Sequence, residues 1–125
     1  MIQVLPEKDI NKLTELYKEK GIEFNENSMA VVARDGQEVL GLCLFEIDKA
    51  TETVFHLEPA DDIMMADGIL RSALHVGVTK NVTNARLGEI LDKTVFKRLG
   101  FLEEDGKTLK INKLFESCCS GCGHK

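Results

Sequence analysis

Residues Thr53–Leu57 (Thr-Val-Phe-His-Leu) are followed by the breaker Glu58-Pro59, and an apolar periodic stretch then extends to Lys80. The first segment has the β-branched and aromatic residues of a short strand. The second has the spacing of an amphipathic helix. A strand that leads into a helix is a common binding place for anions and cofactors, because the first N–H groups of a helix have no partner inside it. The corner from Pro59 to Gly68 is therefore the first candidate for a functional site.

The stretch after Pro59 is predicted to be the longest helix of the chain. Asp61 or Asp62 is suited to cap its N-terminus, because a carboxylate accepts hydrogen bonds from the first N–H groups. The helix is expected to bury one broad face, which carries Met65, Ile69, Ala73 and Val76 with Leu70 and Leu74 beside them.

The rest of the chain alternates between strand and helix patterns. A strand is predicted at Ile2–Leu5, with Pro6 in the first turn of a helix that ends at Gly21. Asp35-Gly36 is a hairpin signal between two apolar runs. Further strands are predicted at Met29–Ala33, Glu38–Asp48, Thr83–Ile90 and Thr108–Phe115, and a short helix at Leu91–Leu99. The predicted order is β-α-β-β-β-α-β-α-β, in an α/β (α+β) fold.

Composition limits the classes of function. The net charge of −5 and a pI near 5.2 argue against binding to nucleic acid. No apolar run approaches the roughly 20 residues that span a membrane, and no signal peptide is apparent, so we expect a cytoplasmic protein. The length predicts a single domain, at residues 1–116, with a cysteine-rich tail at 117–125. Cys43 stands alone in an apolar run and is predicted to be a buried thiol.

The segment Phe96-Lys97-Arg98-Leu99-Gly100-Phe101 resembles the Tyr-x-x-x-Gly-Phe motif of the GNAT acyltransferase superfamily. The hairpin at Gly36, which leads into Val39–Leu42, is similar to the second and third strands of that family. The resemblance covers about Ile2 to Glu116. It implies a mixed, mostly antiparallel sheet that splays between its fourth and fifth strands, with helices on both faces.

The resemblance also implies where acetyl-CoA would bind. In that family the pantetheine arm enters the splay and pairs with the backbone of the fourth strand, here at Phe55 and Leu57. The pyrophosphate rests on the opening of the next helix, here at Met65, Ala66, Asp67 and Gly68. The family's loop has the form Arg/Gln-x-x-Gly-x-Gly/Ala, and only Ala66 fits it. Asp61 stands at the basic position and Met64 at the first glycine.

Candidate catalytic residues differ from the family pattern as well. The family often uses a tyrosine as general acid, and Phe96 occupies that position. Glu89 occupies the position of an earlier asparagine. A base for an amine nucleophile is predicted at Glu58 or His56, which alternation places on the same face of the strand. The alternative is that His56 is a structural histidine and Glu58 a rim carboxylate.

The tail carries four soft or borderline metal ligands, Cys118, Cys119, Cys122 and His124. Their spacing is compatible with zinc, with an iron–sulfur cluster or with a redox-active dithiol. So short a segment would need a second ligand segment to enclose a tetrahedral ion. The alternative is a terminus without bound metal.

Two functions follow from these patterns. The first is an acyl-CoA-dependent N-acyltransferase that acts on a small-molecule or peptide amine. The second is a non-catalytic GNAT-like binding or assembly module that uses its tail for metal, redox or partner contact. The second function is favoured by Phe96, Met64, Asp61 and the cysteine cluster of the tail, and the first by the order of elements. The sequence leaves open whether the protein is a monomer or a homodimer.

Overall fold

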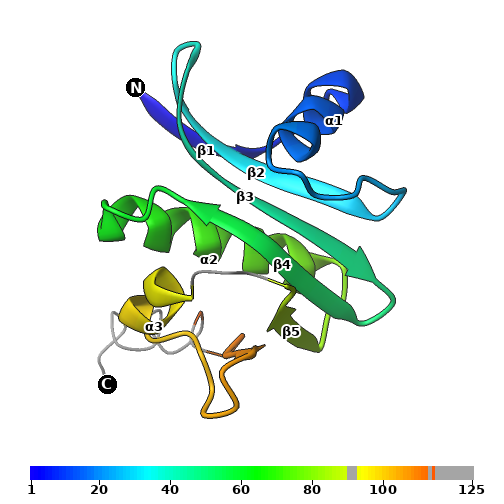
Figure 1. Ribbon diagram of the computed structural model, residues 1–125, viewed down its shortest axis with the longest axis vertical. Coiled ribbons are helices and arrows are strands. Elements are labelled where there is room, and N and C mark those ends of the chain that lie inside the picture. The colour runs from blue at the N-terminus through cyan, green and yellow to red at the C-terminus, as the bar shows by residue number, and fades with distance from the viewer. Residues whose placement is uncertain (90–92, 113, 115–125) are drawn as a thin grey trace.

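The computed structural model describes residues 1–89, 93–112 and 114, and shows one sheet with three helices (Figure 1). The strands are β1 (Ile2–Pro6), β2 (Ser28–Asp35), β3 (Glu38–Asp48), β4 (Thr51–Glu58), β5 (Asn84–Leu87) and β6 (Thr108–Leu109). The helices are α1 (Ile10–Glu19), α2 (Ile63–Thr79) and α3 (Thr94–Leu99). This order of elements confirms the predicted one.

The sheet is mixed and mostly antiparallel, as predicted. Its strands lie in sequence order from β1 to β6, and the one parallel pair is β4 with β5. That pair is joined through α2, because parallel neighbours need a crossover connection.

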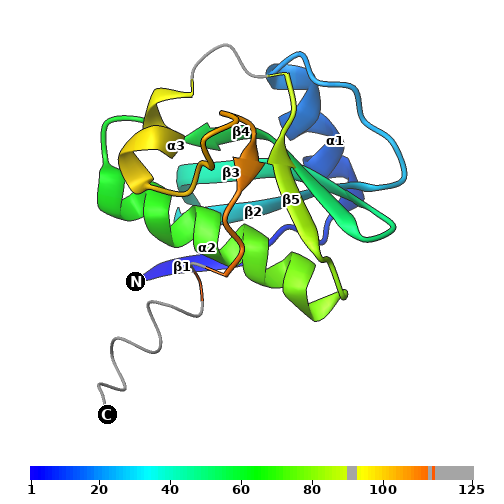
Figure 2. The same ribbon diagram turned by 90° about the horizontal axis from the view of Figure 1, so that it is seen from below.

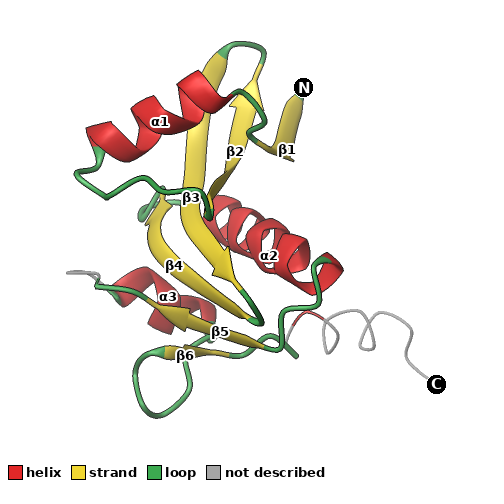
Figure 3. Cartoon of the chain, turned by 90° about the vertical axis from the view of Figure 1, so that its right-hand side faces the viewer, coloured by secondary structure: helices red, strands yellow, loops and turns green. Residues whose placement is uncertain are grey.

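Helices cover both faces of the sheet (Figure 3). Helix α1 packs Leu13 and Tyr17 on residues of β2 and β3 that include Val32 and Leu44. Helix α2 packs Ile69 and its neighbours on the opposite face. The two faces are called here the α1 face and the α2 face. α2 crosses beneath the strands, and α3 lies near its N-terminal end (Figure 2).

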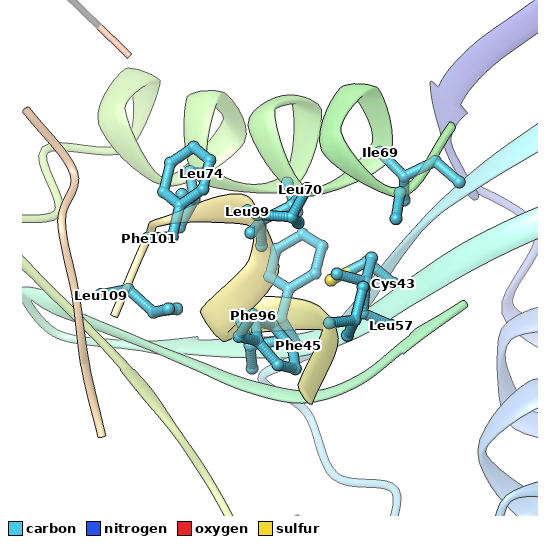
Figure 4. Packing of buried hydrophobic residues seen from close by; sticks show 14 of the residues in the cluster. Cys43, Phe45, Leu57, Ile69, Leu70, Leu74, Phe96, Leu99, Phe101 and Leu109 are labelled. Atoms are coloured by element: carbon cyan, nitrogen blue, oxygen red, sulfur yellow. The ribbon is translucent and has the colours of Figure 1, made fainter. Parts of the chain in front are cut away.

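The main core lies between α2, α3 and the sheet. Phe45, Phe96 and Phe101 fill it together with aliphatic side chains from α2 (Figure 4). Gly100 ends α3 with a φ of 77°, a left-handed conformation that favours glycine. Phe101 then returns fully buried to the core. Cys43 is also fully buried, as predicted, and burial raises the pKa of its thiol.

The β4–β5 ladder is short. It pairs Thr51–Val54 with Asn84–Leu87, and the Gly88 N–H donates to the Val54 carbonyl at 2.8 Å. Beyond Val54, no pairing of β4 with β5 is found in the described part of the chain. The predicted splay between the fourth and fifth strands is therefore present, and among the described residues the backbone of β4 from Phe55 onward has no strand partner on the β5 side.

The predicted boundary between the first strand and the first helix is wrong. Pro6 does not begin the first helix but pairs with Val31 as the last residue of β1, since an edge strand tolerates proline. The helix begins instead at Ile10, where the Asp9 carboxylate accepts the Asn11 N–H at 2.9 Å.

The last strand is also shorter than predicted. β6 contains Thr108 and Leu109 only, because the chain turns at Ile111 and Asn112. Alternation continues in the sequence past this turn, so the pattern alone does not show where pairing stops. Residue Phe115, the predicted end of the strand, lies outside the described residues. None of the described helices is long and apolar enough to cross a membrane.

Glu52 on β4 places a carboxyl group inside the core. Its side chain is 0% exposed, and among the described residues neither carboxyl oxygen has a hydrogen-bond partner. The group lies against α2 at Gly77, where an added Cβ would collide with Glu52 Oε1. Burial raises the pKa of Glu52 from 4.5 to about 8. The folded protein therefore holds this carboxyl protonated at neutral pH.

The raised pKa of Glu52 predicts that stability falls as pH increases from about 4.5 to about 8. In this window the unfolded chain has lost a proton that the folded chain retains, so deprotonation favours unfolding. Glu52→Gln removes this titration. Between about pH 5 and pH 9, urea unfolding should show the parent losing at least about 1.4 kcal/mol relative to the variant, the value of one pKa unit. Asp48→Asn, at an exposed position, is the control, and equal pH dependence in the parent and Glu52→Gln would contradict the prediction.

Candidate functional site

An extra residue in β4 determines which face carries the candidate catalytic side chains. Leu44 is opposite His56, but the next pair is Phe45 with Val54, so Phe55 is inserted as a β-bulge. Val54 lies on the α2 face. Regular alternation would also place His56 there, and the bulge turns His56 to the α1 face instead.

His56 and Glu58 lie on the same face, as predicted, and they touch. His56 Nε2 is 2.6 Å from Glu58 Oε1. The same carboxylate oxygen forms an ion pair with Lys20 Nζ at 2.8 Å. The side chains of His56, Glu58 and Lys20 are 32%, 34% and 28% exposed, so the cluster is half-buried but open to solvent.

The electrostatics of the cluster keep Glu58 ionised. Burial acts to raise the pKa of Glu58, but hydrogen bonds and charges from Lys20 and His56 outweigh it and hold the pKa below its usual value of 4.5. An ionised carboxylate accepts a hydrogen bond from the imidazole and so orients the ring. The pair is therefore suited to accept a proton from a neighbouring amine.

Helix α1 delivers Lys20 to this cluster through its C-terminus. The Gly21 N–H donates to the Lys18 carbonyl at 3.1 Å and the Ile22 N–H to the Tyr17 carbonyl at 3.0 Å. With Gly21 at a φ of 68°, these bonds form a Schellman motif that fixes the backbone around Lys20. The sequence pattern predicted the glycine at this helix end but gave no role to the lysine before it.

Tyr17 attaches α1 to the sheet. Its hydroxyl oxygen lies 2.6 Å from the carbonyls of both Met29 and Phe45, and it accepts the Met29 N–H at 3.1 Å. The hydroxyl has one proton, so it donates to one of these carbonyls at a time. The side chain is fully buried. Tyr17 is thus a structural anchor for the end of α1.

A cavity of about 470 Å³ opens beside the cluster where β5 leaves β4. This volume is within the usual range for small-molecule sites. The β4 cavity, as we call it, is lined by Lys20, Gly21, Ile22, Phe55, His56, Leu57, Glu58, Ala60, Glu89, Val95 and Phe96. It therefore has two apolar residues of α3 on one side and the charged cluster on the other.

Gly88 shapes the mouth of the splay. A Cβ at this position would lie 2.6 Å from the Phe55 ring, so a larger residue would displace that ring. The bulged Phe55 therefore packs across the end of β5, at the point where the two strands separate.

The N-terminus of α2 is capped by an acidic side chain. The Asp62 carboxylate accepts the Met65 N–H at 3.1 Å, as one of the two predicted caps. Intrahelical bonds begin with the Ala66 N–H, which donates to the Asp62 carbonyl. The N–H groups of Ile63 and Met64 therefore precede the helical ladder, and the Met64 side chain is 85% exposed.

The residues predicted to face a pyrophosphate occupy different places in α2. Met65 is partly buried against the core and Ala66 is fully buried. Asp67 forms an ion pair with Arg71, with Asp67 Oδ2 2.8 Å from Arg71 Nε. Gly68 is exposed, and a Cβ added there would meet open space. Their role in binding stays a prediction.

Phe96 and Glu89, at the positions of the family's tyrosine and asparagine, both line the β4 cavity. Phe96 is 1% exposed and has no proton to donate. Glu89 is exposed. Sequence reasoning missed Lys20 altogether, because the contact with Glu58 joins two elements that no local pattern relates.

The tail prediction lies outside the described residues. Cys118, Cys119, Cys122 and His124 are all in this part of the chain, so their binding of zinc or an iron–sulfur cluster stays a prediction. Among the described residues, no group of three His, Cys, Asp or Glu side chains could hold a metal ion.

Comparison with known proteins establishes the fold. Neither protein-family models nor curated proteins give a match to the sequence. Among solved structures, a GNAT-family acetyltransferase from Streptococcus pneumoniae TIGR4 is similar, with a TM-score of 0.54, 20% identity and coverage of 82% of this chain and 88% of that one.

Two further structures show the same likeness. A GNAT-family acetyltransferase from Staphylococcus aureus Mu50 has a TM-score of 0.53 and 12% identity, over 81% of each chain. A Bacillus subtilis acetyltransferase in complex with CoA has a TM-score of 0.54 and 12% identity, over 81% of this chain and 75% of that one. The protein therefore has the GNAT fold and is a divergent example of it.

The hydrogen bonds of Tyr17 predict how strongly the C-terminal end of α1, which carries Lys20, is attached to the sheet. Tyr17→Phe should lower the free energy of unfolding by about 1–3 kcal/mol, because it leaves buried backbone groups at Met29 and Phe45 without this partner. Urea unfolding measures the change. Thr14→Ala, which removes an exposed hydroxyl from the same helix, should stay within about 0.5 kcal/mol of the parent. Equal stability of the Tyr17→Phe variant and the parent would contradict the anchoring role.

Proposed function

We propose that the protein transfers an acyl group from an acyl-CoA thioester to a primary amine. The observation that carries this proposal is the contact of His56 Nε2 with Glu58 Oε1 at 2.6 Å. This contact lies at a cavity beside the part of β4 that is not paired with β5. A proton acceptor, a cationic group and a free strand edge are together there. Amine acylation needs a base and a place for an extended thioester arm.

The free edge of β4 fits the pantetheine arm. Its N–H and C=O groups from Phe55 onward have no strand partner on the β5 side within the described residues. An extended amide-containing chain can bind such an edge as an added strand does. The likeness to a Bacillus subtilis acetyltransferase solved with CoA supports this assignment. The backbone carries the recognition, so it does not depend on particular side chains.

The N-terminus of α2 fits a pyrophosphate poorly. Asp62 already occupies the Met65 N–H, and Asp61 adds a second exposed acidic side chain. Both would repel phosphate charges at close range. We therefore expect acetyl-CoA to bind mainly through its pantetheine arm and more weakly than a basic, glycine-rich loop would allow.

The cluster supplies the proton chemistry. When bound, the thioester supplies an activated acyl carbon. His56 takes a proton from the amine, and ionised Glu58 holds the imidazole in place. Phe96 cannot protonate the departing thiolate, so that proton comes from the amine or from water. The acceptor class is a small-molecule or peptide amine.

A non-catalytic binding module is the alternative function. Two observations favour it: Phe96 replaces the acidic tyrosine, and Asp62 covers the helix end that a pyrophosphate would use. Such a module would bind a partner or a CoA derivative without turning it over. Measured binding without release of free thiol in the presence of amines would support it.

Acetyl-CoA binding tests the proposal. At about 100 times its Kd, the ligand should raise the free energy of unfolding by about 2.7 kcal/mol. Thermal unfolding measures this shift, and isothermal titration gives the Kd. S-acetylpantetheine should also bind, because the arm carries most of the recognition. No shift with either compound at millimolar concentration would contradict an acyltransferase.

The cap of α2 gives a second prediction. Asp62→Asn keeps a good cap, because asparagine caps helices as well as aspartate does. It removes one negative charge near the expected pyrophosphate, so acetyl-CoA should bind about fivefold more tightly, equivalent to about 1 kcal/mol. Titration at low ionic strength limits screening. Asp48→Asn, at the end of β3 opposite the first residue of β4, is the matched control. Equal affinities of the two variants would place the pyrophosphate away from α2.

A further inference from the structure

Lys20 occupies the position that an acceptor amine would take. Its Nζ is 2.8 Å from Glu58 Oε1, the same oxygen that His56 Nε2 contacts at 2.6 Å. The cluster therefore already holds a primary amine against Glu58, the carboxylate that also contacts His56. Lys20, His56 and Glu58 all line the β4 cavity, so Lys20 borders the space assigned to the thioester arm.

The fold holds Lys20 in this position. The Schellman motif at Gly21 fixes the backbone beside it, and the Tyr17 hydroxyl anchors the last turn of α1 to β2 and β3. Gly21 and Ile22 line the cavity next to Lys20. Lys18, two residues earlier, is exposed and has no carboxylate partner among the described residues. One lysine of this turn is thus directed at the cluster and the other is not.

We propose that Lys20 is itself an acyl acceptor, modified within its own chain by the thioester in the β4 cavity. This inference rests on the proposed function and specifies its nucleophile. The Lys20 ammonium gives one proton to Glu58 Oε1, the oxygen it contacts, which also accepts the Nε2–H of His56. The free Nζ then forms a bond to the acyl carbon while the C–S bond breaks. The thiolate leaves and takes a second proton from Nζ, so the products are N-acyl-Lys20, free thiol and one proton.

Acylation of Lys20 would change the site. The amide carries no charge, so the ion pair with Glu58 is lost, and the acyl group fills part of the cavity. The amide is also a poor acyl donor, so the modification stops after one event per chain. The reaction is therefore a self-limiting modification, distinct from turnover on an external amine.

Peptide mass spectrometry of the full chain tests this inference. The protein is incubated with isotope-labelled acetyl-CoA and, in parallel, with S-acetyl-N-acetylcysteamine, a thioester that lacks the nucleotide. We expect the label on Lys20 to approach one per chain, at a rate independent of protein concentration, as an intramolecular step requires. Lys18 reports uncatalysed acylation in the same sample. Lys20 should be labelled at least about 100-fold faster, the lower range for a positioned base.

Variants separate catalysis from simple exposure. Glu58→Gln and His56→Gln should lower Lys20 labelling toward the Lys18 rate, with folding checked by circular dichroism. Two different variants are used because either one alone could perturb β4. Lys20→Arg should abolish the label without creating one elsewhere. Lys18→Arg is the matched control and should leave Lys20 labelling unchanged.

The outcomes distinguish this inference from the proposed function. Binding of acetyl-CoA with Lys20 labelled no faster than Lys18 overturns this inference and leaves the acyltransferase proposal intact. Labelling of Lys20 by the short thioester without binding of acetyl-CoA supports Lys20 as acceptor and overturns CoA as donor. If acetyl-CoA does not bind and Lys20 is labelled no faster than Lys18, both proposals are overturned. A rate that rises with protein concentration overturns modification within the chain.

Discussion

The candidate site depends on one extra residue, the bulged Phe55 in β4. Val54 and Leu57 both face α2, which regular alternation does not allow for residues three apart. Because of the bulge, His56 and Glu58 face α1 and solvent, and do not lie in the core, where an unpaired charge would be costly. The bulge also coincides with the end of the β4–β5 ladder at Val54. One local irregularity thus directs the polar side chains outward at the place where the strand edge becomes free.

The site combines a backbone element that fits acyl-CoA with side chains that differ from the GNAT pattern. In the proposed function the free edge of β4 would bind the thioester arm through N–H and C=O groups, so substitutions elsewhere would change it little. The N-terminus of α2 depends on charge, and Asp62 at its cap opposes a phosphate. A lysine from α1 then completes the cluster from the other layer. The proposed function thus assigns the thioester arm to the unpaired part of β4, and the ion pair of Lys20 with Glu58 shows that the site accommodates an amine.

Much of the fold could be predicted from local sequence signals. The order of elements, the Asp62 cap and the return of Phe101 after Gly100 all depend on neighbouring residues. The shared face of His56 and Glu58 also followed from alternation. The side of the sheet that these two residues face did not follow from the sequence. It depends on a bulge, which is a property of strand pairing, and the residue type at Phe55 does not indicate one. The Lys20–Glu58 contact was missed for a similar reason, since only the packing of α1 on the sheet brings the two together. Pro6 and the short β6 show that alternation does not fix where pairing ends.

The central claim is that acetyl-CoA binds along β4 beside the cluster. The most direct test is to record amide chemical shifts by NMR during a titration with acetyl-CoA, because these shifts report binding residue by residue. The account predicts saturable changes that are largest at Phe55, His56, Leu57 and Glu58, with smaller ones at Gly21 and Ile22 across the β4 cavity. Saturable changes centred elsewhere, such as the hollow between β1 and α2 at Val4 and Val76, would contradict it. An absence of any change at millimolar ligand would contradict it equally.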